Sequence, residues 1–309
     1  MYNDFDSIID ENILRVLLQD QTIKENIIWA TDNYSNLGLG FDKDDHITLD
    51  TLYVIKPRRE KSKIEQAKRT KGKAEVFTPS WICNEMNNNI AEQQFGTKNV
   101  FNFEKDKGWI TNLNKIPFHC VDGKDWVGYI RSKVLEITCG EAPYLVSRYD
   151  TTTGEWIDTF DRIGLLDRKL RVVNENCANG DGWFEWVVEA YKATYGYEYQ
   201  GDNLFLARKN LLLTFVDNYW NRYGNLPKKE KLLKIANIIS WNIWQMDGLK
   251  CVVPNSCKQT NIGQISLFEE NKTYECVGCL KNDNSKHIGM YCNIKDWSTN
   301  QIVRFFDMV

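Results

Sequence analysis

Apolar residues along the chain occur in short runs and in longer stretches with helical spacing, and this alternation predicts a mixed α/β fold. The short run Val134–Ile137 contains Glu136 and leads into a turn at Gly140, followed by Glu141. A run of this kind is typical of a buried parallel strand that passes into a loop beneath a ligand. Glycine permits the tight turn, and the two acids are then available to hydroxyl groups or a cation. An ordinary strand-to-helix turn has the same pattern, so the run alone does not identify a ligand.

The longer amphipathic stretches predict helices that pack on such strands. We expect helices over residues 9–30, 183–195 and 228–240. Asp202 is expected to cap a further helix whose inward face carries Leu204, Ala207, Leu211, Phe215 and Tyr219. Thr78 is expected to cap another helix, with Pro79 at its first position.

A second predicted strand ends at Glu198. In a Rossmann-type fold an acidic residue at this point holds ribose hydroxyls, because one carboxylate accepts hydrogen bonds from both. The simpler interpretation, in which Glu198 merely ends a strand, stays open.

Composition and charge limit the classes of partner. The chain has 309 residues, enough for one large α/β domain and an appendage, and its net charge is −3. Contact with DNA therefore requires a local basic patch or another polypeptide. No apolar segment is long enough to cross a bilayer, and the acidic N-terminus lacks a basic apolar leader. We therefore expect no membrane partner and a cytoplasmic location.

Lysine and arginine are concentrated between Lys56 and Lys73. Such a run is most often the solvated face of a helix. The alternative is a patch that contacts nucleic-acid phosphates, and its position just before Phe77 favours this second interpretation slightly.

Cysteines gather in the C-terminal part of the chain. The chain has nine cysteines, and the spacing of Cys276 and Cys279 lets both thiolates reach one tetrahedral zinc ion. The candidate ligands are Cys257, Cys276, Cys279 and Cys292. The pairing of the remaining ligands stays open, because either Cys251 with Cys257 or His287 with Cys292 could supply the second pair. We expect a closed structural site if metal binds, and a cluster of buried free thiols is the alternative.

Two motifs together give the chain a family resemblance. Phe77-Thr78-Pro79 opens a helix, and Leu135-Glu136-x-x-Cys139-Gly140-Glu141 follows some tens of residues later. This pair resembles the cofactor motifs of adenine-specific DNA methyltransferases of restriction-modification systems. The resemblance implies a Rossmann-like sheet that binds S-adenosylmethionine.

The resemblance also assigns roles to individual residues. Phe77, Thr78 and Pro79 would line the methionine end of the cofactor. The loop beneath it would comprise Glu136, Cys139, Gly140 and Glu141. Further along, Glu198 and the segment up to Ala207-Arg208 resemble the second motif, and Asp247 matches the acid that accepts a hydrogen bond from the cofactor's adenine amino group. Ala142 and Pro143 depart from the family, which usually has a second glycine and a small residue there.

The catalytic part of the family is not found in this sequence. The catalytic loop is Asn-Pro-Pro-Tyr or Asp-Pro-Pro-Tyr after a fourth strand, and Ile302–Val309 resembles that strand, but no Pro-Pro dipeptide occurs in the chain. That loop polarises the amino group of a flipped-out adenine. We therefore expect no catalytic residues here, and a second polypeptide would supply the loop and the domain that recognises double-stranded DNA.

The sequence therefore predicts four regions. They are a helical N-terminal extension with the basic segment (1–72), an S-adenosylmethionine-binding α/β domain (73–250), a Cys-rich insertion (251–300) and the start of a fourth strand (301–309). Two functions compete: the cofactor-binding half of a methyltransferase, and a non-catalytic remnant or zinc-bearing interaction module. A nicotinamide oxidoreductase is disfavoured, because the loop lacks the third glycine of the dinucleotide fingerprint.

Overall fold

A three-stranded parallel sheet organises the structure, a computed structural model that describes residues 6–40, 42, 44–73, 75, 77–118, 125–177, 182–257 and 276–309. The strands lie in the order β3 (Val134–Glu136), β4 (Thr194–Glu198) and β5 (Ile243–Gln245). Glu136 lies opposite Gly196, and Glu198 lies opposite Gln245. The two glutamates therefore end neighbouring strands at the same edge of the sheet. The predicted mixed α/β class is confirmed.

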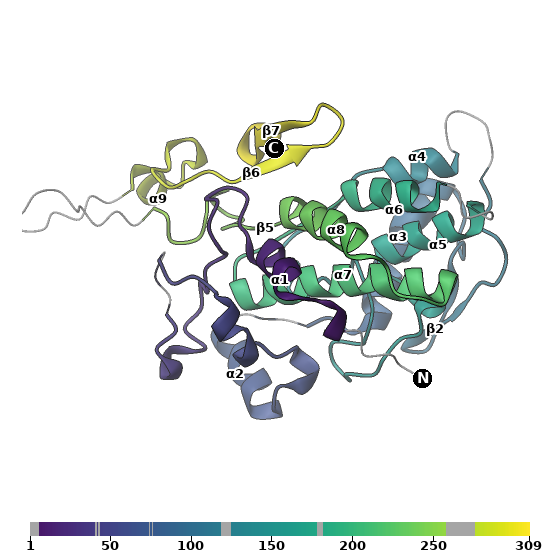
Figure 1. Cartoon of the computed structure of the whole chain (residues 1–309), viewed down its shortest axis with the longest axis horizontal. Coiled ribbons are helices and arrows are strands. Elements are labelled where there is room, and N and C mark those ends of the chain that lie inside the picture. The colour runs from purple at the N-terminus through teal and green to yellow at the C-terminus, as the bar shows by residue number, and fades with distance from the viewer. Residues whose placement is uncertain are drawn as a thin grey trace, which may run out of the picture.

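Helices hold far more of the described residues than strands do (Figure 1). They are α1 (Glu11–Leu18), α2 (Lys63–Lys73), α3 (Ser80–Phe95), α4 (Trp126–Arg131), α5 (Leu165–Asn176), α6 (Trp183–Lys192), α7 (Gly201–Tyr223), α8 (Lys229–Asn242) and α9 (Val277–Lys281). Short 3-10 helices cover Asp6–Ile8, Ser35–Leu37, Leu49–Val54, Arg58–Glu60, Thr159–Asp161, Asn284–Lys286 and Phe305–Met308. The long helix α7 runs through the middle of the molecule, and both α1 and α7 pack against α8.

The sheet separates two apolar cores, because alternate residues of a strand point to opposite faces. Ile243 faces a large helical core to which α1, α5, α6, α7 and α8 contribute. Tyr195, Tyr197 and Trp244 face a smaller C-terminal core, together with Cys292 and other residues after position 250. The C-terminal segment therefore covers the face of the sheet that the helices leave open.

The first predicted helix is shorter than expected. α1 ends at Leu18, whereas the prediction continued to residue 30. The carboxylate of Asp20 accepts hydrogen bonds from the backbone N–H groups of Thr22 and Ile23, which turns the chain. Trp29 beyond it lies outside any helix, and its carbonyl accepts from the N–H of Gly201 at the start of α7. The predicted helix over 228–240 is confirmed as α8.

Two predicted helix caps are replaced by contacts from distant segments. α3 begins at Ser80, whose N–H donates to the carboxylate of Asp150 over 2.7 Å, so Thr78 does not cap it. Asp202 lies in the first turn of α7 and not at its cap, which is Gln200. Its carboxylate is instead paired with Arg69 over 2.6 Å.

The remaining strands form two antiparallel hairpins outside the parallel sheet. β1 (Asn102–Lys105) pairs with β2 (Gly108–Thr111), and β6 (Asn293–Asp296) pairs with β7 (Gln301–Arg304). A strand therefore does begin at residue 301, but it pairs with β6 and not with the parallel sheet. It ends in a 3-10 turn closed by an ion pair between Arg304 and Asp307.

Candidate functional site

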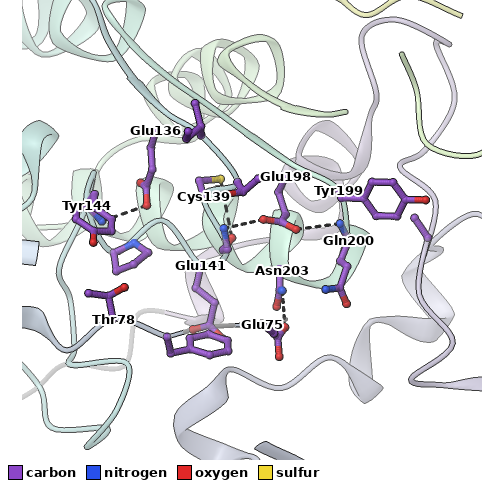
Figure 2. A pocket seen from close by; sticks show the side chains of 16 residues that line it. Glu75, Thr78, Glu136, Cys139, Glu141, Tyr144, Glu198, Tyr199, Gln200 and Asn203 are labelled. Atoms are coloured by element: carbon purple, nitrogen blue, oxygen red, sulfur yellow. Dashed lines mark hydrogen bonds between the residues drawn. The ribbon is translucent and has the colours of Figure 1, made fainter. Parts of the chain in front are cut away.

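A pocket lies at the carboxyl edge of the parallel sheet, where β3 and β4 end. Its volume is about 660 Å³, within the range of small-molecule sites. It is lined by Ala30, Glu75, Phe77, Thr78, Glu136, Ile137, Thr138, Cys139, Gly140, Glu141, Pro143, Tyr144, Glu198, Tyr199, Gln200 and Asn203. We call it the acidic pocket. Figure 2 shows Glu198 at its centre, between Cys139 and Gln200.

Backbone N–H groups hold the two strand-end glutamates in place. Glu198 accepts from Gly140 over 2.8 Å and from Gln200 over 3.1 Å, one bond to each oxygen. Glu136 accepts from Tyr144 over 3.4 Å and from Leu145 over 3.2 Å. Each carboxylate oxygen has two acceptor positions. Both carboxylates therefore keep acceptor capacity for a ligand donor.

The loop after β3 approaches the pocket closely because of its backbone conformation. Thr138, Gly140 and Ala142 all have positive φ, at 46°, 55° and 64°. A left-handed conformation is unfavourable for residues other than glycine, and Ala142 adopts it at the position where the methyltransferases usually have glycine. The side chain of Cys139 packs on Gly196 of β4, where an added Cβ would lie 3.4 Å from the sulfur.

Phe77 and Thr78 line the pocket opposite the strand ends. The guanidinium of Arg58 lies 3.8 Å from the centroid of the Phe77 ring. The backbone N–H of Arg58 donates to the carboxylate of Glu141 over 2.7 Å. The segment before α2 thus fixes both Phe77 and Glu141. Pro79, the third residue of this motif, is not among the described residues that line the pocket.

The charge of the pocket is one-sided. Among the described residues that line it there are four glutamates and neither lysine nor arginine. Burial raises the pKa of Glu198 to about 7, although the N–H groups of Gln200 and Gly140 oppose this shift. Burial also raises the pKa of Glu136 well above its usual value, and neighbouring Glu198 adds to the effect. Such a site favours a cationic ligand, because a cation stabilises the ionised carboxylates.

Burial governs the other two titratable groups of the loop. It raises the pKa of Cys139 well above the usual value, with Glu136 and Glu198 adding to the shift, so the thiol stays protonated. It also raises the pKa of Glu141, and nearby Lys61 opposes this change. Cys139 is therefore a packing residue of the loop and not an activated nucleophile.

Asp247 lies outside the pocket lining. It follows β5 by two residues, its carboxylate lies 3.2 Å from the ammonium of Lys250, and its backbone bonds to Val252. The residue that closes β5 beside Glu198 is Gln245, whose side chain donates to the carbonyls of Ile28 and Tyr199. The structure thus brings Glu136 and Glu198 together with Phe77 but leaves Asp247 apart.

Sequence reasoning missed several polar residues of the pocket, among them Glu75 and Asn203. The Asn203 amide donates to Glu75 over 2.5 Å (Figure 2). Arg69 donates to the same carboxylate oxygen over 3.1 Å. The second oxygen of Glu75 and the amide oxygen of Asn203 are buried without a hydrogen-bond partner in the described chain. Both are acceptors that a ligand donor would satisfy.

The basic run divides into two structural roles. Lys63, Lys68 and Lys71 are exposed on α2, as a solvated helix face requires. Arg69 is instead 2% exposed, and its ion pairs with Asp202 and Glu75 connect α2 to the pocket. The side chain of Lys61 is also buried.

A second cluster of functional groups lies in the C-terminal segment. The thiols of Cys257, Cys276 and Cys279 and the imidazole of His287 lie within 4.8 Å of one another and could hold a metal ion. The His287 Nδ1 atom lies 3.6, 3.5 and 3.6 Å from the three sulfur atoms, in the order given. Gly278 permits this approach, since an added Cβ would lie 2.8 Å from the same Nδ1 atom.

Cys292 does not belong to this cluster, in contrast to the prediction. Its backbone N–H donates to Cys251, and its thiol donates to the carbonyl of Gln245 over 3.3 Å. This pairing turns the side chain into the C-terminal core, where it is fully buried. His287, which the sequence analysis had weighed as an alternative, occupies the fourth position.

Comparisons with known proteins identify no family for the chain, so a function has to be argued from the geometry of the site. No protein-family model, no curated protein and no solved structure matches the chain. Among the described residues, every helix is too short or too polar to span a lipid bilayer.

Proposed function

We propose that the acidic pocket binds S-adenosylmethionine and that the protein is the cofactor-binding part of a DNA adenine methyltransferase. The observation that carries the proposal is the convergence of Glu136, Glu198 and Phe77 on one pocket. These residues come from separate motifs, and their convergence is what a shared ligand requires. The proposed sheet is Rossmann-like, with the ligand at the carboxyl ends of its strands.

The chemistry of the lining fits this cofactor. S-adenosylmethionine carries a sulfonium and an ammonium, which suit a pocket lined by four glutamates. The free acceptor positions of Glu198 suit the two ribose hydroxyls. A dinucleotide fits poorly, because its pyrophosphate would face carboxylates without a compensating lysine or arginine among the described lining residues.

When bound, the cofactor would supply a methyl group for the exocyclic amino group of adenine. The residues described here would bind and orient it, since Glu198 and Glu136 are fixed by backbone hydrogen bonds and Phe77 by Arg58. The proposal includes double-stranded DNA as the substrate, a second polypeptide with the catalytic loop, and a cytoplasmic location. A cofactor-binding remnant without catalysis is the alternative, and it would bind cofactor without methylating DNA when mixed with that polypeptide.

Calorimetric titration with S-adenosylmethionine tests the proposal. We expect saturable binding to the unaltered protein and at least about tenfold weaker binding to Glu198→Gln, because a hydrogen bond to a charged group is lost. Asp247→Asn is the matched control and should bind like the unaltered protein, since Asp247 lies outside the lining. Absence of binding, or equal heats for Glu198→Gln and the unaltered protein, would contradict the proposal.

We further propose that the Cys257–Cys276–Cys279–His287 cluster holds a structural Zn²⁺ ion. Tetrahedral zinc with bonds of about 2.3 Å to sulfur and about 2.0 Å to nitrogen places those atoms about 3.5 Å apart. The three distances from His287 Nδ1 to sulfur, 3.5–3.6 Å, agree with this value. The other ring nitrogen lies 3.3 Å from the side-chain oxygen of Asn284, which would fix the tautomer that leaves Nδ1 free for metal. Four protein ligands leave no open position, as in structural sites.

Metal analysis of the purified protein tests the zinc site. We expect about one zinc ion per chain, and loss of that zinc in both Cys279→Ala and His287→Ala. Cys292→Ala is the matched control, because this buried thiol lies outside the cluster, and it should retain zinc. Loss of zinc in Cys292→Ala with retention in His287→Ala would instead support the ligand set predicted from the sequence. A chain without zinc after growth in zinc-supplemented medium would refute the site.

A further inference from the structure

A second pocket lies where the N-terminal segment packs against α7. Its volume is about 690 Å³. It is lined by Ile9, Leu14, Leu52, Tyr53, Ile55, Lys56, Pro57, Arg59, Glu60, Arg148, Tyr149, Trp156, Phe205, Leu206, Lys209, Asn210 and Leu213. We call it the basic pocket. None of the functions proposed above uses it.

Positive charge dominates the rim of this pocket. The described lining residues include four cations, Lys56, Arg59, Arg148 and Lys209, and one acid, Glu60. Asp217 neutralises Arg148 over 2.9 Å, whereas Lys56 is exposed. The rim therefore attracts an anionic group.

Arg59 is held in an orientation that suits phosphate binding. Its guanidinium lies 3.9 Å from the centroid of the Trp156 ring and 5.4 Å from that of Tyr149. Stacking on an aromatic face fixes the guanidinium plane and leaves its edge for hydrogen bonds. At this edge Nη2 donates to the half-exposed carboxylate of Glu60 over 3.2 Å, a contact that a phosphate would replace. The Nε atom is buried and has no hydrogen-bond partner within the described chain. A phosphate oxygen is the acceptor for which a guanidinium fork is best shaped.

The rest of the pocket suits a flat organic group. The side chains of Leu52, Ile55 and Leu213 provide apolar surface, and Tyr53 is an aromatic residue with 80% of its surface exposed. A nucleobase combines a flat apolar face with polar edges and stacks on aromatic side chains. A pocket with an aromatic residue, apolar walls and a cationic rim therefore matches a base linked to phosphate.

We propose that the basic pocket binds a nucleoside phosphate, either as a free nucleotide or as a unit of a nucleic-acid strand. The base lies against Tyr53 and the apolar wall, and the phosphate is bound by Arg59, Lys56 and Lys209. This inference is independent of cofactor binding in the acidic pocket.

Calorimetric titration with ADP at low salt tests the proposal. We expect saturable binding of ADP, at least about tenfold weaker binding of adenosine, and at least about tenfold weaker binding of ADP to the variant Arg59→Gln/Lys209→Gln, because charge-assisted phosphate contacts are lost. Lys68→Gln/Lys71→Gln is the matched control, since it removes the same charge from the exposed face of α2 and should bind ADP normally. Circular dichroism of both variants confirms that they are folded.

Competition with a short single-stranded oligonucleotide distinguishes the two sources of the ligand. Displacement of ADP by the oligonucleotide would assign the pocket to a nucleic-acid strand, and failure to displace it would assign the pocket to a free nucleotide. Absence of ADP binding, or equal affinity of ADP for the Arg59→Gln/Lys209→Gln variant and the unaltered protein, would overturn the proposal. Loss of ADP binding in Glu198→Gln would overturn it as well, because the nucleotide would then lie in the acidic pocket. Pyrophosphate that binds as tightly as ADP would refute the base contact.

Discussion

The acidic and basic pockets are nearly equal in volume and opposite in charge. Their volumes are about 660 and 690 Å³, so size does not separate their ligands. They meet at Glu141 of the acidic pocket, where Tyr149 of the basic pocket donates to the carboxylate and the Asn210 amide of the basic pocket donates to the backbone carbonyl over 3.1 Å. Charge alone therefore directs a cation to one side of this contact and an anion to the other.

The two pockets also differ in how their charged groups are held. Glu136 and Glu198 of the acidic pocket are buried at strand ends and bound by backbone N–H groups. The cations of the basic pocket include the exposed Lys56 and the partly exposed Arg59. A buried carboxylate has a shifted pKa and a fixed position, whereas an exposed lysine retains its rotamer freedom. We therefore expect pH to control the acidic pocket and ionic strength to control the basic one.

The largest effect should follow from removing two carboxylates from the acidic pocket. The double variant Glu136→Gln/Glu198→Gln should bind S-adenosylmethionine about 100-fold or more weakly, because each lost charged acceptor contributes about 1.5–3 kcal/mol. Calorimetry measures the change. Arg59→Gln/Lys209→Gln is the control from the opposite pocket and should alter this affinity less than about twofold. Equal losses in both variants would show that the pockets are not separate sites.

A change of pH should produce the next largest effect. Burial raises the pKa of Glu198 from 4.5 to about 7, so the Glu198 carboxyl is mostly protonated at pH 6 and mostly ionised at pH 8. Affinity for the cationic cofactor should therefore rise about tenfold between pH 6 and pH 8. Glu136, whose pKa is also raised by burial, contributes to the same trend. Asp202 faces Glu198 from α7 and raises its pKa, but burial is outweighed by Arg69, which lowers the pKa of Asp202 itself, so Asp202 stays ionised at both pH values. In Glu198→Gln the rise should be smaller, and an equal rise would exclude Glu198 as its source.

The stability of the ligand-free protein should change in the opposite direction. A group whose pKa is raised by folding stabilises the folded state below its unfolded pKa, and this stabilisation is lost as pH rises through the folded pKa. Glu198 therefore stabilises the ligand-free protein at pH 4.5 and no longer does so above about pH 7. Thermal unfolding at pH 6 and pH 8, with and without S-adenosylmethionine, separates the pH dependence of stability from that of cofactor affinity.

The pocket residues that could be predicted from the sequence are those with a local signal. Glu136 and Glu198 each follow a short apolar run, and parallel strands bring the ends of such runs to one edge. Glu75 and Asn203 have no such signal, since their contact joins residues 128 positions apart. The same limit applies to Asp202, which was predicted as a helix cap but lies in the first turn of α7, and whose partner, Arg69, comes from another helix.

The zinc ligands and the first helix show two other limits of prediction from the sequence. Cys276 and Cys279 were predictable because a gap of two residues lets both thiolates reach the same tetrahedral zinc ion. The choice between His287 and Cys292 depends on the backbone bond from Cys292 to Cys251, which spacing does not encode. The apolar spacing after Leu18 is helical, but Asp20 bonds to the following N–H groups and ends the helix.

Replacing the sulfonium of the ligand by a neutral sulfur should have a smaller effect than the pH change. S-adenosylhomocysteine has the same shape without the methyl and the charge, so it should bind about fivefold more weakly at pH 8, where the Coulomb attraction is lost. The preference should shrink below about twofold in Glu136→Gln/Glu198→Gln, because the opposing carboxylates are gone. Equal affinity of the unaltered protein for both ligands would mean that the pocket does not sense the positive charge.

The smallest effect should come from the contact between the pockets. Tyr149→Phe removes a hydroxyl that donates to Glu141 and accepts from Asn210 over 3.1 Å, so the free energy of unfolding should fall by about 1 kcal/mol. Glu141 keeps its bond from the Arg58 N–H, and affinity in either pocket should therefore change less than about threefold. Tyr53→Phe, at an exposed tyrosine of the basic pocket, is the control for stability. A tenfold change of affinity in both pockets would mean that this hydroxyl couples them, and charge alone would then no longer explain how they differ.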